Sequence, residues 1–310
     1  MIKRTLCFSN PAYLSLKNHQ MVIKLPEVEK SNITKEMKKE AVTTIPIEDI
    51  GVVVLDNQQI TLTQGLLAHL LEYNCAVITC DSRHLPIGLQ LPLEGNTTQS
   101  ERFHDQIEAS LPLKKQLWQQ TIQQKIANQA AVLNQKRGLE VKNMLRWVNE
   151  VKSGDTENIE GKAAAFYWKN MFPDVPDFTR GREGIAPNNL LNYGYAILRA
   201  TMARALVASG LLPTLGIHHH NKYNAYCLAD DIMEPYRPYV DALLIDITQK
   251  MSHQEEITIG HKQQLLTIPA LDVNIAGQRS PLMVAVAQTT ASLYKCFSGE
   301  SRKILNPTMD

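Results

Sequence analysis

Residues 215–241 read LGIHHHNKYNAYCLADDIMEPYRPYVD, and they decide how the rest of the chain is interpreted. Three consecutive histidines, at 218–220, precede a group of carboxylates in this stretch. The carboxylates belong to Asp230, Asp231, Glu234 and Asp241. Imidazole nitrogens and carboxylate oxygens are common protein ligands of divalent metal ions. The stretch therefore predicts a metal site.

Residues 230–246 are predicted to form one helix. Asp230 or Asp231 can cap its N-terminus, and apolar side chains recur behind them at helical spacing. The apolar side chains are Ile232, Tyr236, Tyr239, Leu243 and Leu244. On such a helix Glu234 and Asp241 share one face, and Asp231 lies one turn before Glu234.

The acidic pair Asp231 and Glu234 also has a purely structural interpretation. Its spacing is that of a capping box with Asp in place of Ser or Thr, and capping is commoner than catalysis. The histidines favour the functional interpretation, because they follow Gly216 at the end of an apolar run, where a turn presents side chains. Arg237, one turn after Glu234, can steady that carboxylate or reach a phosphate.

Composition limits the class of protein. A chain of 310 residues, 44% of them hydrophobic, can bury a sizeable core in one large domain or two ordinary ones. The longest apolar runs fall far short of the roughly 20 residues that a membrane helix needs. The five cysteines include no CxxC pair, so neither a zinc knuckle nor a disulfide framework is indicated. We expect a soluble, cytoplasmic protein that does not insert into membranes.

The net charge of +1 gives no global signature of nucleic-acid binding. Basic residues are in excess only in the central third of the chain. A solvated helical surface explains this modest excess nearly as well as a track for phosphates does.

Residues 1–90 are predicted to be rich in β-strands. Short apolar segments bounded by polar turns occur at 5–9, 13–16, 21–25, 44–47, 51–55 and 76–80. Leucines at helical spacing between 62 and 71 add one helix, capped by Thr61 or Thr63. We expect a sandwich-like domain suited to dimerisation or scaffolding.

Residues 91–310 are predicted to be helical, after a boundary at 86–100 where Pro, Gly, Asn and Thr cluster and the strand pattern stops. Apolar residues recur at helical spacing in the segments 101–135, 141–151, 159–172, 190–208 and 280–297. Pro112 is expected to interrupt or restart the first of these helices. The expected fold class is therefore α+β, with a small N-terminal β-rich domain followed by a larger all-α catalytic domain.

Glu160 is the best candidate for a further metal anchor. It stands at the start of the predicted helix 159–172 and is followed by Gly161 and by alanines at 163–165. Such small side chains allow another helix or a substrate backbone to come close to the carboxylate. The structural alternative is a glutamate that the helix dipole favours in the first turn.

Four ordered motifs resemble the signature of the CRISPR adaptation integrases, the Cas-one family, and look most like the branch that accompanies type II systems. They are Glu160-Gly161-x-Ala163-Ala164-x-x-Tyr167, Asn192-Tyr193-Gly194-Tyr195-x-x-Leu198, Gly216-Ile217-x-His219 and Leu228-Ala229-Asp230-Asp231-x-Met233-Glu234-Pro235-x-Arg237-Pro238. Several motifs in the family's order are far more specific than any one of them alone.

The resemblance implies a metal-dependent DNA endonuclease and integrase of antiviral defence. Its catalytic and metal-binding triad falls on Glu160, His219 and Glu234, with Asp231 as an outer-shell residue. His218 or His220 could replace His219 as the ligand. Two carboxylates and one imidazole suit Mg²⁺ or Mn²⁺.

The implied reaction joins the 3′-hydroxyl of a short DNA fragment to a phosphodiester at a CRISPR repeat, and water as the attacking group would give a nuclease. Residues expected to hold or position the DNA are Lys162, Tyr167, Tyr193, Arg199, Lys222 and Arg237.

The implied partners are double-stranded DNA, a second copy of the chain, and a Cas-two family protein that bridges two homodimers. In type II systems the RNA-guided effector nuclease and a DNA-end-binding ring protein are further candidates.

Two other functions fit parts of the pattern. A zinc- or manganese-dependent hydrolase of a small molecule would use the histidines at 218–220 as its main ligands, although it would want a further motif such as HExxH. A non-catalytic DNA-binding scaffold would leave the acidic residues idle.

Overall fold

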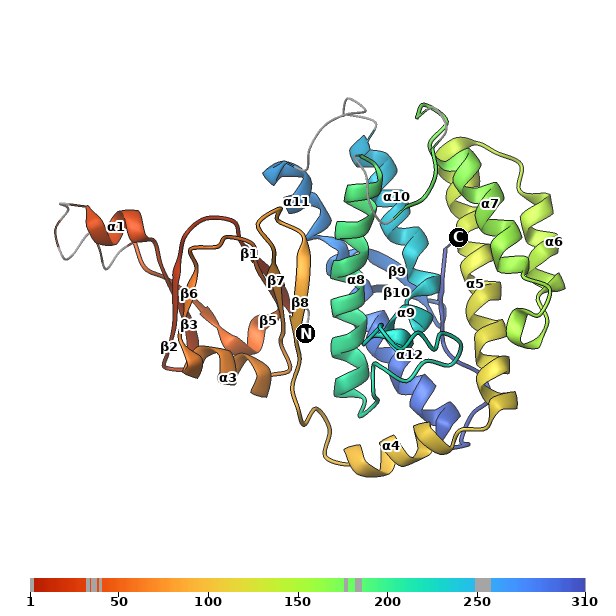
Figure 1. Cartoon of the computed structure of the whole chain (residues 1–310), viewed down its shortest axis with the longest axis horizontal. Coiled ribbons are helices and arrows are strands. Elements are labelled where there is room, and N and C mark those ends of the chain that lie inside the picture. Colours follow the sequence, from red (N-terminus) through yellow and green to blue (C-terminus); the bar gives the residue numbers. More distant parts are fainter. Residues whose placement is uncertain are drawn as a thin grey trace. The chain divides into compact units, whose positions relative to one another are not determined.

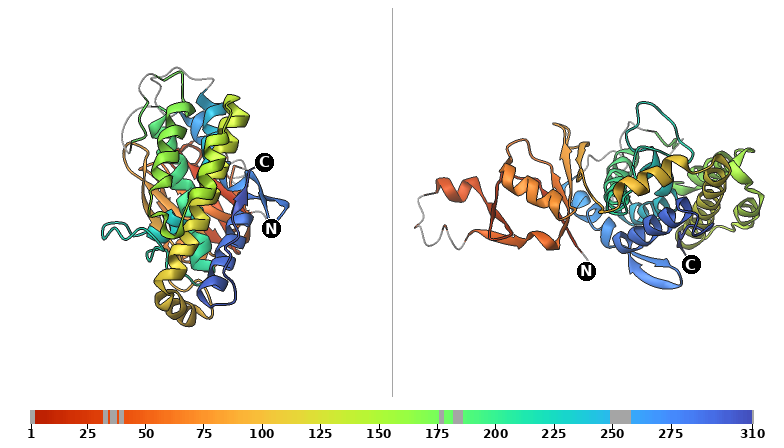
Figure 2. Two further views of the ribbon diagram at one scale, coloured as in Figure 1. Left: turned by 90° about the vertical axis from the view of Figure 1, so that its right-hand side faces the viewer. Right: turned by 90° about the horizontal axis from the view of Figure 1, so that it is seen from below.

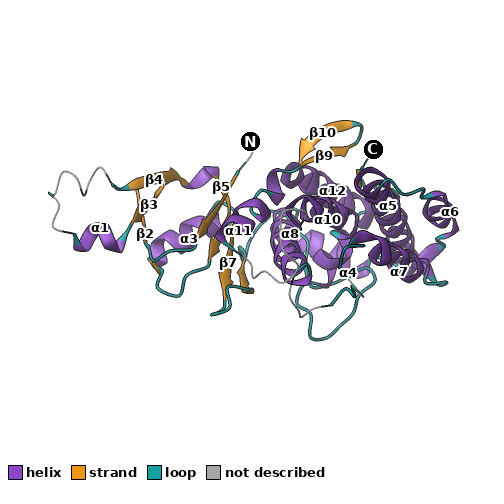
Figure 3. Ribbon diagram, turned by 90° about the horizontal axis from the view of Figure 1, so that it is seen from above, coloured by secondary structure: helices purple, strands orange, loops and turns teal. Residues whose placement is uncertain are grey.

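The computed structural model describes residues 3–31, 34, 38, 41–175, 178–181, 186–248 and 258–309. The chain divides into two compact units, Met1–Gly95 and Asn96–Asp310. Strands dominate the smaller unit and helices dominate the larger one (Figures 1 and 3). The α+β fold class predicted from the sequence is therefore confirmed.

Two four-stranded sheets form within the described part of the smaller unit. The first has the order β1-β5-β7-β8, made of Arg4–Phe8, Ile50–Leu55, Ala76–Cys80 and Pro86–Gln90. Its first three strands are parallel, and β8 pairs antiparallel with β7. The second has the order β4-β3-β2-β6, made of Thr43–Pro46, Gln20–Lys24, Tyr13–Lys17 and Thr61–Leu62.

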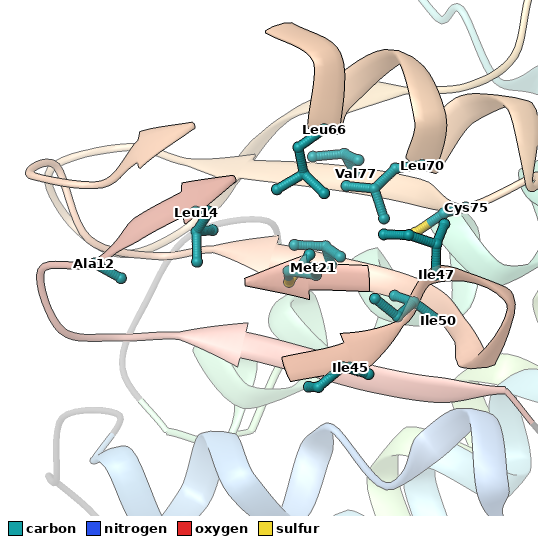
Figure 4. Packing of buried hydrophobic residues seen from close by; sticks show 11 residues of the cluster. Ala12, Leu14, Met21, Ile45, Ile47, Ile50, Leu66, Leu70, Cys75 and Val77 are labelled. Atoms are coloured by element: carbon teal, nitrogen blue, oxygen red, sulfur yellow. The ribbon is translucent and has the colours of Figure 1, made fainter. Parts of the chain in front are cut away.

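The core of the smaller unit is made by side chains from both sheets and from helix α3, Gln64–Glu72 (Figure 4). Leu14 and Met21 come from the second sheet, Ile50 from the first, and Leu66 from α3. Thr63 caps α3, because its side chain accepts a hydrogen bond from the backbone N–H of Leu66 at 3.4 Å. The smaller unit also contains the short helices α1, Pro26–Lys30, and η1, Ile47–Asp49.

The strand β8 corrects one sequence-based expectation. The segment 86–100 was expected to end the strand pattern, yet Pro86–Gln90 pairs with β7. Pro86 is tolerated because it is the first residue of a strand at the edge of the sheet. Gly88 allows close pairing, since a Cβ atom there would collide with the hydroxyl of Thr79. The division between the two units follows Gly95.

The long helix α5, Leu111–Arg137, lies at the centre of the larger unit's contacts, packing against α6, α7, α10 and η3. It runs alongside α7 in Figures 1 and 2. The expected break in the segment 101–135 is confirmed, because one helix ends at Glu108 and Pro112 occupies the first turn of α5, where a missing N–H is harmless. The other helices that precede the histidines are α4, Gln99–Glu108; α6, Lys142–Glu150; η2, Ser153–Asp155; α7, Ile159–Met171; and α8, Asn188–Ala208.

The region expected to be one helix over 230–246 is three shorter elements instead. They are α9, Cys227–Ile232; η3, Glu234–Tyr236; and α10, Arg237–Thr248. Pro235 stands in the first turn of η3 and Pro238 in the first turn of α10, where a missing N–H is tolerated. Asp230 and Asp231 lie inside α9 and do not cap it, and the capping-box interpretation is wrong.

The larger unit was expected to be all-α, but it also contains a three-stranded antiparallel sheet of order β10-β9-β11. These strands are Gln278–Pro281, Asp272–Ile275 and Pro307–Thr308. The remaining helices are α11, Ile259–Leu265; η4, Ile268–Ala270; and α12, Leu282–Phe297. Of the helices within the described residues, none combines the length and apolarity that crossing a membrane requires.

Candidate functional site

Glu160 is held at the beginning of α7 by the turn that precedes the helix. The carboxylate of Asp155 accepts hydrogen bonds from the backbone N–H groups of Ile159 and Glu160, each at 2.9 Å. Asn158 has a left-handed backbone and caps the helix by accepting from Gly161. The local sequence thus fixes the backbone of Glu160, whose side chain then reaches α5.

Glu160 and Glu234 converge on one ammonium group, that of Lys125 on α5. The Nζ atom of Lys125 lies 2.6 Å from Oε1 of Glu160 and 2.6 Å from Oε2 of Glu234. Arg237 adds an ion pair, with its Nε atom 3.0 Å from Oε1 of Glu234. The side chains of Lys125 and Glu234 are 11% and 6% exposed, so both charges are largely removed from water.

Burial and charge act against each other in this cluster. Burial alone would lower the pKa of Lys125, but the carboxylates of Glu234 and Glu160 outweigh it and the pKa is raised. Burial would likewise raise the pKa of Glu234, whereas Arg237 and Lys125 bring it below its ordinary value. Lys125 and Glu234 therefore both carry their charges near neutral pH.

His219 is fixed by a buried carboxylate. Its Nδ1 atom lies 2.5 Å from Oδ1 of Asp231, whose side chain is fully buried. Asp231 also accepts hydrogen bonds from the backbone N–H groups of His218, at 2.9 Å, and His219, at 3.3 Å. The hydrogen bond with Asp231 is the main cause that raises the pKa of His219. Because Nδ1 is engaged, Nε2 is the nitrogen that His219 can offer to a ligand.

The turn that carries the histidines requires Gly216. A Cβ atom at this position would collide with the carbonyl oxygen of His219 and lie 2.7 Å from Oδ2 of Asp231. On the other side, the buried ring of Trp118 stacks on His218 with parallel planes and centroids 4.1 Å apart. His219 meets the same indole ring edge-on at 5.5 Å.

The three imidazoles consequently have different surroundings. His218 is stacked on Trp118 and perpendicular to His219, and burial lowers its pKa. His219 is bound to Asp231, and His220 is exposed, as the other two histidines also are. They do not form the shared three-histidine ligand set that a small-molecule hydrolase would use.

The residues present fit a hard divalent cation. The carboxylates of Glu160 and Glu234 both contact the ammonium of Lys125. The carboxylate of Asp231 orients the imidazole of His219, as carboxylates usually do for metal-binding histidines. Across the described ranges, no group of three or more His, Cys, Asp and Glu side chains already stands at metal-binding geometry. The ammonium of Lys125 lies between the two carboxylates.

Asp241 was expected on the same face as Glu234, but its carboxylate has other partners. It accepts hydrogen bonds from Tyr195, at 2.5 Å, and from Tyr167, at 2.9 Å. Its burial raises the pKa to about 6. The three side chains tie α10 to α8 and α7.

The residues expected to contact DNA fall into three groups. Lys162 and Lys222 are exposed and lie over the rings of Trp147 and Tyr223, respectively. Arg199 and Arg237 are engaged in ion pairs, the former with Asp230 at 2.6 Å and the latter with Glu234. The rings of Tyr167 and Tyr193 are fully buried, so in this structure they present no face on which a base could stack.

Sequence reasoning missed Lys125 and Trp118, and it gave Tyr195 no role although one of the quoted motifs contains it. Lys125 had a detectable signal, because it stands among the buried positions of a helix whose other inward-facing residues include Ile122 and Ile126. A charged residue at an apolar position is commonly functional. Trp118 gave no such signal, since aromatic residues are ordinary in a helical core.

Three comparisons with known proteins agree with this architecture. The family model described as CRISPR associated protein Cas1 matches residues 7–270. A protein of Neisseria meningitidis serogroup C (strain 8013), described as CRISPR-associated endonuclease Cas1, is 35% identical over 306 residues. The match covers 98% of this chain and 95% of that protein.

Solved structures share the fold. A casposase bound to an integration product is similar with a TM-score of 0.77 and 20% identity, over 98% of this chain and 92% of that one. A chain of a Cas6-RT-Cas1–Cas2 complex is similar with a TM-score of 0.70 and 19% identity, over 97% of this chain and 35% of that one.

Proposed function

This chain belongs to the Cas1 family of CRISPR-associated proteins, and from that premise we propose that it is a metal-dependent DNA endonuclease and integrase of CRISPR adaptation. The proposed reaction is a transesterification in which the 3′-hydroxyl of a short DNA fragment attacks a phosphodiester at a CRISPR repeat. The observation that supports it best is the convergence of Glu160 and Glu234 on one cationic position. The charges of both carboxylates also reach the imidazole of His219 and help to raise its pKa.

Glu160, His219 and Glu234 are the proposed ligands of Mg²⁺ or Mn²⁺. When bound, such an ion would activate the attacking hydroxyl and stabilise the charge that develops around phosphorus. Asp231 holds His219 with Nε2 directed away from the Asp231 carboxylate. Arg237 holds one oxygen of Glu234 by its ion pair.

The contacts with DNA are proposed for the two exposed lysines, Lys162 and Lys222, through phosphates. Arg199 is proposed to act indirectly, because its ion pair with Asp230 supports the segment that follows the histidines. Asn224 donates to the same carboxylate at 2.8 Å. The buried Tyr167 and Tyr193 are proposed to position helices rather than to stack on bases.

We further propose a homodimer whose copies are bridged by a Cas2 family protein. Such two-fold symmetry suits an operation on both ends of a duplex. The similarity to a chain of a Cas1–Cas2 complex supports this arrangement at the level of the fold. The type II effector nuclease and a DNA-end-binding ring protein are proposed as partners in fragment selection, and the cytoplasm is proposed as the compartment.

Strand transfer tests the proposal. The purified chain, with and without its Cas2 partner, is incubated with Mg²⁺ or Mn²⁺, a labelled short duplex and a supercoiled plasmid that carries a repeat array. We expect label to join the repeat boundary with the wild type and not with Glu234→Ala. Glu157→Ala is the matched control, because Glu157 is an exposed glutamate near Glu160 in the sequence that pairs with the surface residue Lys152. If Glu234→Ala joins as much label as the wild type does, Glu234 is not a residue of the active site.

A further inference from the structure

Lys125 occupies the position at which the two proposed carboxylate ligands meet. Its ammonium is 2.6 Å from an oxygen of Glu160 and 2.6 Å from an oxygen of Glu234. Lys125 donates a hydrogen bond to Glu160 and forms an ion pair with Glu234, and another cation could not enter between the same oxygens without moving the ammonium. The ammonium of Lys125 and a divalent cation would therefore compete for the same position between the two carboxylates.

The charges in the cluster balance in the absence of a metal. Two carboxylates, Glu160 and Glu234, face two cations, Lys125 and Arg237. Adding a divalent ion while the ammonium stayed in place would bring two cations within a few ångströms in a poorly solvated site, where like charges repel strongly. The site can take the ion only if the ammonium leaves.

The two cations of the cluster differ in their ability to move away. Arg237 is held from a second side, because its guanidinium lies over the ring of Tyr195 with 4.7 Å to the ring centroid. The side chain of Lys125 is a flexible four-carbon chain, and the ammonium at its end is a compact charge whose N–H donors can rotate. Lys125 is thus the cation that can be displaced, while Arg237 remains with Glu234.

We propose that Lys125 is an internal counter-ion that fills the metal position between Glu160 and Glu234 and is expelled when a divalent cation binds. The inference rests on the proposed metal-dependent function. Its consequence is that the free chain binds the ion more weakly than its ligand set alone would allow. Removal of the lysine charge is therefore expected to strengthen metal binding.

Metal affinity measures this directly. Binding of Mn²⁺ to the full chain, without DNA, is followed by the electron paramagnetic resonance signal of the free ion. We expect Lys125→Gln to bind Mn²⁺ at least about tenfold more tightly than the wild type, because a unit positive charge has been removed from the site. Glutamine can still donate to a carboxylate, which preserves the packing. Lys125→Arg keeps the charge and is expected to bind no more tightly than the wild type.

The matched control is Lys136→Gln, on the same helix. Lys136 pairs with Asp246 at the surface, with distances of 2.7 and 2.8 Å, and this change is expected to leave the Mn²⁺ affinity unaltered. Thermal unfolding gives a second measurement. Lys125→Gln should melt at a lower temperature than the wild type without metal and should gain more from Mn²⁺.

The outcomes separate the two proposals. If the wild type binds Mn²⁺, Glu234→Ala does not, and Lys125→Gln binds with unchanged or weaker affinity, the displacement of Lys125 is overturned and the metal site stands. If neither the wild type nor Lys125→Gln shows saturable binding, the metal-dependent function falls and the inference falls with it.

Discussion

The Nδ1 atom of His219 lies 2.5 Å from Oδ1 of Asp231, and the carboxylate of Asp231 is fully buried behind the imidazole. The same carboxylate accepts from two backbone N–H groups of the histidine turn. One buried side chain thus sets both the ring of His219 and the backbone that carries it.

Replacing Asp231 by Asn is expected to weaken metal binding and strand transfer by about 10–100-fold, the usual effect of changing a group that orients a metal ligand. The amide keeps the shape but removes the negative charge and turns an N–H group toward one of its donors. Mn²⁺ affinity and the rate of joining would be measured on the same preparations. Asp246→Asn, at an exposed carboxylate, serves as the control. Full metal affinity in Asp231→Asn would show that His219 is oriented by something else.

Asp241 makes the unfolding free energy depend on pH. Burial raises its pKa from 3.8 to about 6, so the folded chain binds this proton more tightly than the unfolded chain does. The contribution of Asp241 is fully present below pH 3.8 and is lost as the pH rises through about 6. At 1.36 kcal/mol for each pKa unit, the loss amounts to about 3 kcal/mol.

Urea unfolding of the wild type and of Asp241→Asn, followed across this pH range, checks the prediction. The difference in unfolding free energy between the two proteins should shift in favour of the variant as the pH rises. The comparison isolates Asp241, because all other groups titrate in both proteins. A difference that stays constant with pH would mean that Asp241 ionises normally.

Gly216→Ala is expected to destabilise the chain by about 1–3 kcal/mol, because the added methyl group overpacks the space between the His219 carbonyl and Asp231. Strand transfer should fall as well, since the histidine turn must shift. The control is Gly260→Ala in α11, where the nearest atom to the new Cβ would be 3.7 Å away. That change should be neutral or slightly stabilising, as alanine favours helices. Thermal unfolding and the joining assay would be run on both variants.

Lys162→Ala and Lys222→Ala are expected to weaken DNA binding and to lower the slope of log affinity against log salt by about 1 each. The reason is that each lysine lost from a phosphate contact releases one counter-ion fewer. Lys142→Ala is the control, since Lys142 is exposed but pairs with Glu140. Salt titrations of binding to a short duplex measure the slopes. Slopes equal to that of the wild type would exclude both lysines from the DNA interface.

The β-rich unit was largely predictable because its signals are local. β5, Ile50–Leu55, is an uninterrupted apolar run that suits a strand buried on both faces. Thr63 is a residue type that favours the N-cap position, and it caps α3. The strand β8 was missed because Pro86 and Gly88 lie within it, and these residue types, with the polar residues that follow, resemble a loop. Its place depends on pairing with β7, which sequence pattern does not reveal.

In the candidate site, the motifs predicted which residues carry chemistry, but not how they pair. Asp231 could be interpreted as a helix cap from the sequence, and only the tertiary structure brings it against the turn at His219. Likewise, nothing near Lys125 in the sequence indicates Glu160 or Glu234. Pro235 and Pro238, three residues apart, each lack the N–H that a helix interior uses, so the segment 230–246 is divided into shorter elements instead of one helix.

Helix α5 carries both Trp118, which the histidines contact, and Lys125, which the two glutamates contact. These residues are two turns apart on one face, about 10 Å along the axis. The length of the helical segment from Trp118 to Lys125 therefore sets the distance between the histidines and the two glutamates of the site. Insertion of a single residue between them would rotate one half by about 100° relative to the other, whereas point substitutions on the outer face of α5 would leave the spacing intact.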